Sequence, residues 1–353
     1  MRFSPVLTTL CILATVASGQ ERIDRWEKNT ESFRRERIEE LKQRIADSTY
    51  KEINSIIVIR NGRLLLEEYF NGATREKKHN PRSVGKTFAS AVLGIALKDR
   101  YIKSVDQTLS DFYDLTKYDN FDDKKVRVSL KHLLTMTSGF DGFDFNEKSI
   151  GNEENMYPQS DWVLWTLNLP MAQDRRPGDR WYYFTAGIVV LGDILNRTLP
   201  GGLEAYADSA FFKPLGIFDY EWQHTPQGVP NTAGGIMLRP LDFAKFGQVY
   251  KNEGAWGGRQ ILPKSWIAES LQKHSQTTNE GERYGYLWWN KTYQAGGKSH
   301  DVYYCSGNGG NKIFVFADYP LVVVVTASAY GKRYAHTQVD EMMQHYIIPA
   351  IIN

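Results

Sequence analysis

The chain has 353 residues, of which 42% are hydrophobic and 24% are charged. This length and composition allow a large buried core, arranged as one large domain or two closely packed ones. The 43 Lys and Arg residues nearly balance the 41 Asp and Glu residues, and they are scattered along the chain, which argues against a nucleic-acid partner.

The first residues have the pattern of a secretory signal. Arg2 precedes an apolar stretch over residues 6–17, and small residues at 17–19 provide a signal-peptidase site. We expect a signal peptide over residues 1–19, with cleavage before Gln20 and export to the periplasm or beyond the cell. The apolar stretch is shorter than the roughly 18 residues that a membrane span needs, so we expect no stable membrane insertion after cleavage. Cys305 would be the only remaining cysteine, which excludes an internal disulfide.

The next segments predict a helix and a hairpin. Residues 21–47 are rich in charge, with apolar side chains at roughly helical intervals, and we expect an amphipathic helix there. Residues 55–60 and 64–69 are β-branched and apolar and are joined by Asn61-Gly62, the commonest two-residue hairpin signal. The pattern predicts a β-hairpin.

A polar loop then leads into a nearly all-apolar segment. Pro81 disfavours the helical conformation at Asn80, and residues 83–97 have the length and residue types of a helix too apolar for a surface. We therefore expect Ser83 to open a buried helix.

The rest of the chain changes in character along its length. Residues 106–231 predict an irregular, mainly helical region, with helical patterns over 130–136, 161–167 and 187–195. Further helices are expected over 243–250, 263–271 and 337–348, and strands over 284–289, 302–305, 312–316 and 321–327. A hairpin near one end and strands near the other predict an α+β fold, in which one antiparallel sheet is built from both chain ends and covered by helices on both faces.

Ser83-Val84-Gly85-Lys86 matches the Ser-x-x-Lys pattern, in which the serine is a nucleophile and the lysine helps to remove its proton. A spacing of three residues places both side chains on one helix face. The helix N-terminus would favour negative charge on the serine oxygen, and burial would disfavour the protonated lysine. A serine cap on a core helix, with Lys86 reaching out to solvent, is the structural alternative.

Gly85-Lys86-Thr87 also resembles the end of a phosphate-binding loop. That motif needs a glycine five residues before Gly85, so that backbone amides can surround the phosphates. The position holds Asn80, and the neighbouring Pro81 has no amide hydrogen. The sequence therefore disfavours nucleotide binding.

Two further stretches carry polar and glycine residues. Residues 177–187 form a Pro-Gly turn that leads through aromatic residues into an apolar helix, and residues 305–311 form a glycine-rich connection between two strands. Taken alone, the first is explained by an aromatic core turn and the second by a hairpin. The seven histidines form no His-Glu-x-x-His pattern, and we expect no metal and no organic cofactor.

In this order, the three stretches resemble the serine β-lactamase-like hydrolases, in the branch that holds class C β-lactamases, related esterases, D-aminopeptidases and 6-aminohexanoate-dimer hydrolases. The resemblance extends over about residues 50–345 and includes the stretches 132–139, 233–236 and 284–289. It implies a β-lactamase/transpeptidase-like antiparallel sheet flanked by helices, with an inserted, mainly helical subdomain. One catalytic domain would then span residues 20–353, its sheet part formed by 50–105 with 232–353 and its insertion by 106–231.

The resemblance also implies roles for individual residues. Ser83 would be the nucleophile, Lys86 its partner and Tyr183 the proton-transferring phenol of a Tyr-x-Asn motif. The oxyanion and substrate contacts would come from four residues: Thr185, Ser306, Gly307 and Asn308. An amide near Asn308 would pair with the amide of Ser83 as the oxyanion hole.

Two positions depart from the family pattern. Thr185 replaces an asparagine that would bind a substrate amide, and Cys305 replaces a lysine that would attract a carboxylate. We therefore expect an exported serine hydrolase that cleaves a small-molecule ester, lactone or amide through an acyl-enzyme on Ser83. A β-lactamase or penicillin-binding D-peptidase and a catalytically silent binding protein are the alternatives. Trp181, Tyr303 and Tyr304 are candidates to line an acyl pocket or to pack in the core.

Overall fold

The computed structural model describes residues 26–352, so the signal predicted over residues 1–19 lies outside the described residues. Its main feature is an eight-stranded antiparallel sheet in the order β2-β1-β12-β11-β10-β9-β8-β7. The strands are β1 (Ile53–Arg60), β2 (Arg63–Tyr69), β7 (Ser275–Gln276), β8 (Arg283–Tyr284), β9 (Trp289–Ala295), β10 (Lys298–Gly307), β11 (Asn311–Phe316) and β12 (Leu321–Ala327).

The sheet joins the two ends of the chain, as the sequence predicts. Asn61 and Gly62 have φ values of 53° and 70°, the left-handed pair that a two-residue hairpin turn requires. β1 then pairs with β12, with Ile57 opposite Val324. Every residue of β12 is buried, because helices cover both faces of the sheet at this strand.

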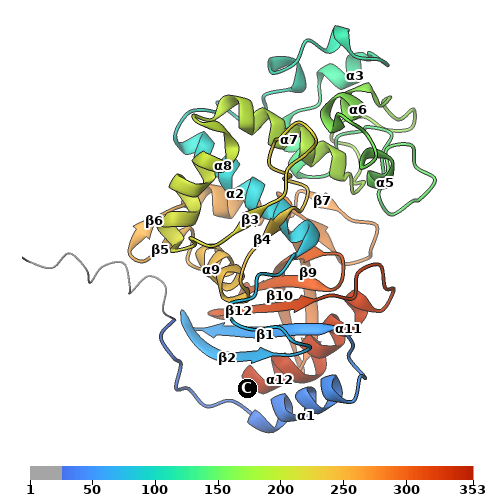
Figure 1. Cartoon of the computed structure of the whole chain (residues 1–353). Coiled ribbons are helices and arrows are strands. Elements are labelled where there is room, and N and C mark those ends of the chain that lie inside the picture. The colour runs from blue at the N-terminus through green and yellow to red at the C-terminus, as the bar shows by residue number, and fades with distance from the viewer. Residues whose placement is uncertain (1–25, 353) are drawn as a thin grey trace, which may run out of the picture.

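Helices form a layer on each side of the sheet (Figure 1). One side carries α1 (Arg35–Ala46), α11 (Ala335–Met342) and α12 (Ile348–Ile351). The other side carries α2 (Gly85–Lys98) and α9 (Pro240–Lys251), and α9 packs directly on β1, β11 and β12. The predicted arrangement of an antiparallel sheet between helices is confirmed.

Mainly helical sequence lies between β2 and β7. It contains α3 (Asp123–Val126), α4 (Leu130–Leu134), α5 (Glu153–Met156), α6 (Trp162–Asn168), α7 (Thr185–Thr198), α8 (Gly202–Ala207) and α10 (Lys264–Ser270). The short strands β3 (Glu221–Trp222), β4 (Ile236–Met237), β5 (Ala255–Trp256) and β6 (Arg259–Gln260) form two small hairpins. Side-chain caps begin several of these helices; Asp161, for example, accepts the amide of Leu164 at the start of α6. The boundaries of the predicted helical insertion, at residues 106 and 231, stay a prediction.

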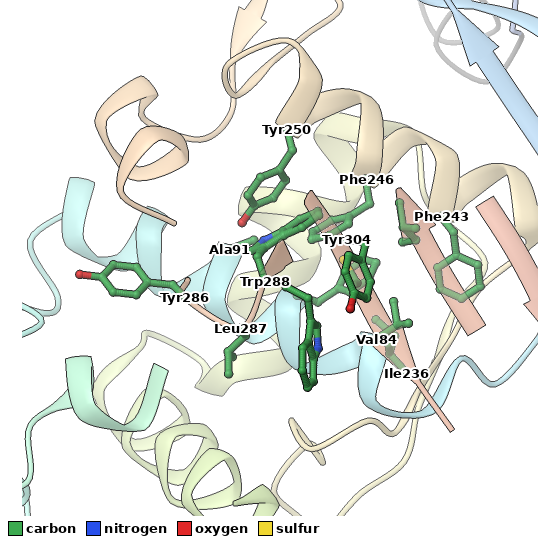
Figure 2. Packing of buried hydrophobic residues seen from close by; sticks show 14 of the residues in the cluster. Val84, Ala91, Ile236, Phe243, Phe246, Tyr250, Tyr286, Leu287, Trp288 and Tyr304 are labelled. Atoms are coloured by element: carbon green, nitrogen blue, oxygen red, sulfur yellow. The ribbon is translucent and has the colours of Figure 1, made fainter. Parts of the chain in front are cut away.

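An aromatic cluster fixes α2 against the sheet. Phe88 of α2 stacks on Phe246 of α9 with ring centroids 4.0 Å apart, and Phe246 in turn stacks on Trp288. Figure 2 shows Phe246, Tyr250 and Trp288 gathered beside Ala91, which lies on α2. This packing holds the start of α2 in a fixed place, with Lys86 in its first turn and Ser83 in the turn just before it.

Two predicted elements differ from the structure, and most of one strand was not predicted. The helix expected over 21–47 begins only at Arg35, because residues before it run beside β2, where the amide of Asn29 donates to the carbonyl of Leu64. The strand expected over 284–289 is instead the end of β8, a tight turn in which Leu287 has a φ of 66°, and the first residue of β9. Most of β9 was not predicted, because its polar residues obscure the alternation of apolar and polar side chains that marks a strand. Within residues 26–352, no helix has the length and apolarity needed to cross a membrane.

Candidate active site

Ser83 lies in a single 3₁₀ turn, Arg82–Val84, that leads directly into α2. The residue before it, Arg82, has a φ of 54°, so the chain bends sharply at this point. The end of β10 reaches the same turn: a Cβ added to Gly307 would lie 1.9 Å from the carbonyl oxygen of Pro81 and 3.1 Å from the backbone nitrogen of Ser83. Glycine at 307 therefore allows the strand to approach the serine.

Lys86 is buried and points back toward Ser83. Its Nζ lies 2.7 Å from Ser83 Oγ and donates a second hydrogen bond, 2.6 Å long, to the carbonyl oxygen of Ala233. This carbonyl can come so close because Gly85 and Gly234 face one another without side chains. Burial lowers the pKa of Lys86, while the charges of Glu153 and Asp144 oppose that shift. A neutral amine at this place can accept the Ser83 proton.

Tyr183 completes a group of three polar side chains. Its ring stacks between Phe145 and Trp289, with centroid distances of 5.1 Å and 5.9 Å, and lies 5.2 Å from Lys86 Nζ. Burial raises the pKa of Tyr183 well above its usual range, and a hydrogen bond with Ser83 lowers it only in part. The phenol therefore stays protonated and can donate. The neighbouring Tyr182 instead stacks under the guanidinium of Arg175.

The structure separates Thr185 from this group. Thr185 is the first residue of α7, where its amide donates to Asp144 Oδ2 at 2.6 Å. Its hydroxyl is buried and has no hydrogen-bond partner among the described residues. The side chain does not line the cavity beside Ser83, so the predicted contact of Thr185 with a substrate has no support from its position.

Ser306, Gly307 and Asn308 do lie beside Ser83, at the end of β10. The turn that follows is held in place, because Asn308 Oδ1 accepts the amide of Gly331 and the carbonyl of Asn308 accepts from the Asn311 side chain. These bonds fix the backbone where the resemblance expects an oxyanion donor.

Cys305 of β10 lies opposite Ile313 of β11. Its side chain is fully buried and points away from the cavity into the core. The hydroxyl of Thr87 donates to its Sγ at 3.3 Å, and burial raises the pKa of the thiol. The cysteine is a packing residue, inert toward substrate. Tyr303 and Tyr304 also lie outside the cavity lining, as does Trp181.

A cavity of about 460 Å³ opens in front of Ser83. Its wall contains the predicted residues Ser83, Tyr183, Ser306, Gly307 and Asn308. It also contains residues that the sequence reading missed: Asp144, Phe145, Glu147, Asn152, Glu153, Glu154, Asn155, Trp289 and His336. Most of these come from residues 144–155, a loop and one short helix without periodicity, so no sequence signal places them at the site.

Asp144 links this loop to Tyr183. Its carboxylate accepts the amides of Thr185 and Glu153, at 2.6 Å and 2.9 Å, and its own amide donates to the carbonyl of Tyr183 at 2.9 Å. Burial and the nearby charge of Glu153 raise the pKa of Asp144 to about 7, against the opposing effect of Thr185 and Lys86. Asp144 therefore fixes the position of the Tyr183 turn and, in its ionised form, adds negative charge beside it.

Together, Ser83, Lys86 and Tyr183 can carry out nucleophilic attack on an acyl carbon, with proton transfer through the lysine and the phenol. Within residues 26–352, no group of three or more His, Cys, Asp or Glu side chains is placed to hold a metal ion.

The sequence profile of the Beta-lactamase family matches residues 50–344, most of the chain. This protein belongs to the beta-lactamase family. It is thus a member of a superfamily of serine hydrolases, and the predicted family resemblance is confirmed.

Solved structures show the same fold at low identity. A Bacillus anthracis protein assigned as a 6-aminohexanoate-dimer hydrolase has a TM-score of 0.73 and 18% identity, over 92% of this chain and 87% of that one. A Bacteroides dorei protein assigned as a β-lactamase has a TM-score of 0.71 and 19% identity, over 90% and 99%. EstCE1, described as a hydrolase with promiscuous acyltransferase activity, has a TM-score of 0.70 and 17% identity, over 87% and 97%. No curated protein matches the chain.

Proposed function

We propose that this member of the beta-lactamase family is an exported hydrolase that cleaves a small ester, lactone or amide through an acyl-enzyme on Ser83. The observation that carries the proposal is the 2.7 Å contact between buried Lys86 Nζ and Ser83 Oγ, made beside Tyr183, which lines the same cavity as Ser83. Burial lowers the pKa of Lys86, so more of it is neutral and able to accept the serine proton near neutral pH than of a solvated lysine. Among residues 26–352, no carboxylate lies within hydrogen-bond distance of its Nζ, which contacts Ser83 Oγ and the carbonyl oxygen of Ala233.

The reaction follows from the placement of the groups. Neutral Lys86 takes the proton of Ser83 while Oγ bonds to the acyl carbon, and the backbone amides of Ser83 and Asn308 hold the oxyanion. The proton passes through Lys86 and the Tyr183 phenol to the leaving alcohol or amine as its bond to the acyl carbon breaks. A water molecule then attacks the acyl carbon and gives its proton to the same groups. As the bond between the acyl carbon and Oγ breaks, they return that proton to Oγ, which releases the acid and restores Ser83.

The direct test is covalent labelling. Wild-type protein should react with a fluorophosphonate probe and hydrolyse a chromogenic short-chain ester, and Ser83→Ala should lose both activities. Ser299→Ala is a matched control. Ser299 is exposed and lies at the start of β10, the end of the strand opposite to Gly307, which contacts the Ser83 turn. If the wild type and Ser83→Ala behave alike, the mechanism is wrong: two inactive proteins would favour a silent binding protein on this fold, and two active ones would require another nucleophile.

A chromogenic β-lactam separates the second candidate function. Cys305 faces the core, and the wall of the 460 Å³ cavity contains no lysine or arginine that could attract the carboxylate of a β-lactam; Arg82 lines an adjoining cavity, where it lies over the ring of Tyr330. We therefore expect much slower turnover of the β-lactam than of the ester. Faster turnover of the β-lactam would favour a β-lactamase or a penicillin-binding D-peptidase.

Export has its own test, which depends only on residues 1–19. Expression of the full chain should yield a mature protein that begins at Gln20, as measured by intact mass, in the periplasm or the medium. Retention of residues 1–19 on the product would contradict export by signal cleavage.

A further inference from the structure

A buried asparagine holds the turn that carries Asn308. Asn311 is the first residue of β11, and only 1% of it is exposed. Its Nδ2 donates to the carbonyl oxygen of Asn308 at 2.8 Å, and its Oδ1 accepts the amide of Ala327, at the end of β12, at 3.0 Å. The second bond identifies the oxygen of the side-chain amide, because a backbone N–H can only donate. Both ends of Asn311 are therefore bound to backbone groups, and one of them fixes residue 308.

His79 makes a third hydrogen bond to this asparagine. Its Nε2 lies 2.7 Å from Asn311 Oδ1. Because that oxygen is an acceptor, Nε2 must carry the hydrogen and donate it. Burial lowers the pKa of His79, so its ring is neutral at neutral pH and holds its one proton on Nε2. The ring also stacks on Tyr330, with centroids 6.5 Å apart, which keeps the donor aimed at Asn311.

The backbone of His79 belongs to the segment that leads into Ser83. Its amide donates to the carbonyl oxygen of Leu238 at 2.9 Å, and its carbonyl accepts the amide of Leu238 at 3.3 Å. The carbonyl of the next residue, Asn80, accepts the hydroxyl of Tyr330 at 2.9 Å. This segment is therefore held in place up to the Ser83 turn, and the side chain of His79 links it to the turn after β10.

We propose that His79 and Asn311 are positioning residues for the oxyanion hole, because they join the segment that carries Ser83 to the turn that carries Asn308. The inference rests on the proposed function, since the oxyanion forms during acyl transfer at Ser83. Neither residue lines the 460 Å³ cavity or the adjoining one, so neither touches the substrate. Their effect is on the transition state: a displaced amide still admits the ester but binds the developing negative charge less well.

The first test removes the donor and then restores it. His79→Phe keeps a ring beside Tyr330 but has no N–H. With p-nitrophenyl butanoate, we expect kcat and kcat/KM to fall together about tenfold while KM changes little, the signature of an interaction made only in the transition state. His79→Gln returns an N–H near the place of Nε2, and its kcat should lie within about threefold of the wild-type value.

His300→Phe is the matched control for the loss of a histidine hydrogen bond. His300 is buried near the start of β10, away from Gly307, and its Nε2 donates to the carbonyl of Ala295 at 3.1 Å. This variant should lose stability but keep the wild-type kcat per folded molecule. A loss of kcat in His300→Phe equal to that in His79→Phe would show a general effect of stability and would overturn the positioning role.

A boronic acid measures the oxyanion hole more directly, because its tetrahedral adduct on Ser83 mimics the intermediate. The Ki of butylboronic acid should rise about tenfold in His79→Phe, in parallel with the fall in kcat/KM. Asn311→Leu should lower kcat about a hundredfold, and adding His79→Phe to it should cost less than about twofold more, since the histidine acts through the asparagine. If Asn311→Leu does not fold, the two His79 variants and the boronic acid decide the question.

Two results separate this inference from the proposed function. A kcat and a boronic-acid Ki that both stay within about twofold of wild type in His79→Phe, with all activity dependent on Ser83, would overturn the positioning role and leave the hydrolase intact. Activity that survives Ser83→Ala would instead overturn the proposed function.

Discussion

Replacing Gly307 with alanine adds one methyl group where the end of β10 meets the turn that carries Ser83. The new Cβ would lie 1.9 Å from the carbonyl oxygen of Pro81. Non-bonded heavy atoms prefer separations of about 3.5 Å, so the strand and the turn must move apart by roughly 1.5 Å. A displacement of about 1 Å in a reacting geometry costs about a hundredfold in rate, and loss of an oxyanion donor costs about as much or more. We expect kcat/KM to fall by about two to three orders of magnitude.

The same change also overpacks the core, so activity must be separated from stability. Gly247→Ala is a suitable control, because its Cβ would lie 2.6 Å from Val322 Cγ1, in the contact between α9 and β12. Each variant should lose about 1–3 kcal/mol of unfolding free energy. Urea unfolding gives that loss, and ester hydrolysis per folded molecule gives kcat/KM. Only Gly307→Ala should lose activity; a kcat/KM within about threefold of wild type would refute the close approach of β10 to Ser83.

Three further predictions concern proton transfer and charge. Tyr183→Phe keeps the stacked ring but removes the phenol, so kcat for ester hydrolysis should fall about a hundredfold while the melting temperature changes little; an unchanged kcat would exclude the proton role. Burial lowers the pKa of Lys86, and only its neutral form accepts the Ser83 proton, so kcat/KM should rise with pH through an apparent pKa below the ordinary lysine value of 10.5; a pH-independent rate would contradict this. The pKa of Asp144 is raised from 3.8 to about 7, which means that the folded protein binds this proton more tightly and that the resulting stability, full below pH 3.8, is lost as the pH rises to about 7. The melting temperature of Asp144→Asn relative to wild type should therefore increase over that pH range, and a constant difference would contradict the shift.

Much of the fold could be predicted because its signals are local. The Asn61-Gly62 turn and the apolar run that forms β12 specify their elements within a few residues. The segment before Arg35 could not be predicted, since its helical periodicity is overridden by hydrogen bonds to Leu64 that form only in the folded protein. β9 was missed for a related reason: Asn290 is buried and Lys291 pairs with Asp340 of α11, so polar residues stand where its alternation would otherwise show apolar ones.

The candidate site divides in the same way. Ser83 and Lys86 are three residues apart, so their contact follows from helix geometry alone. Asp144 and Phe145 reach the cavity through a loop, and their positions depend on hydrogen bonds to Tyr183 and Thr185 that no spacing encodes. Trp289 was visible in the sequence as an apolar residue, but its place beside Tyr183 follows only from the turn after β8.

The altered motif positions bear on substrate choice more than on the reaction. Cys305 turns toward Thr87, and Thr185 lies behind Asp144, so neither touches Ser83 or Lys86. Acyl transfer at Ser83 needs neither residue. Relative to the family pattern, cysteine at 305 removes one positive charge, while the carboxylates of residues 144–154 place negative charge at the same cavity. Both features make the electrostatic potential of this cavity more negative, which disfavours an anionic substrate such as a β-lactam carboxylate. The chromogenic β-lactam should therefore be turned over more slowly than the neutral ester.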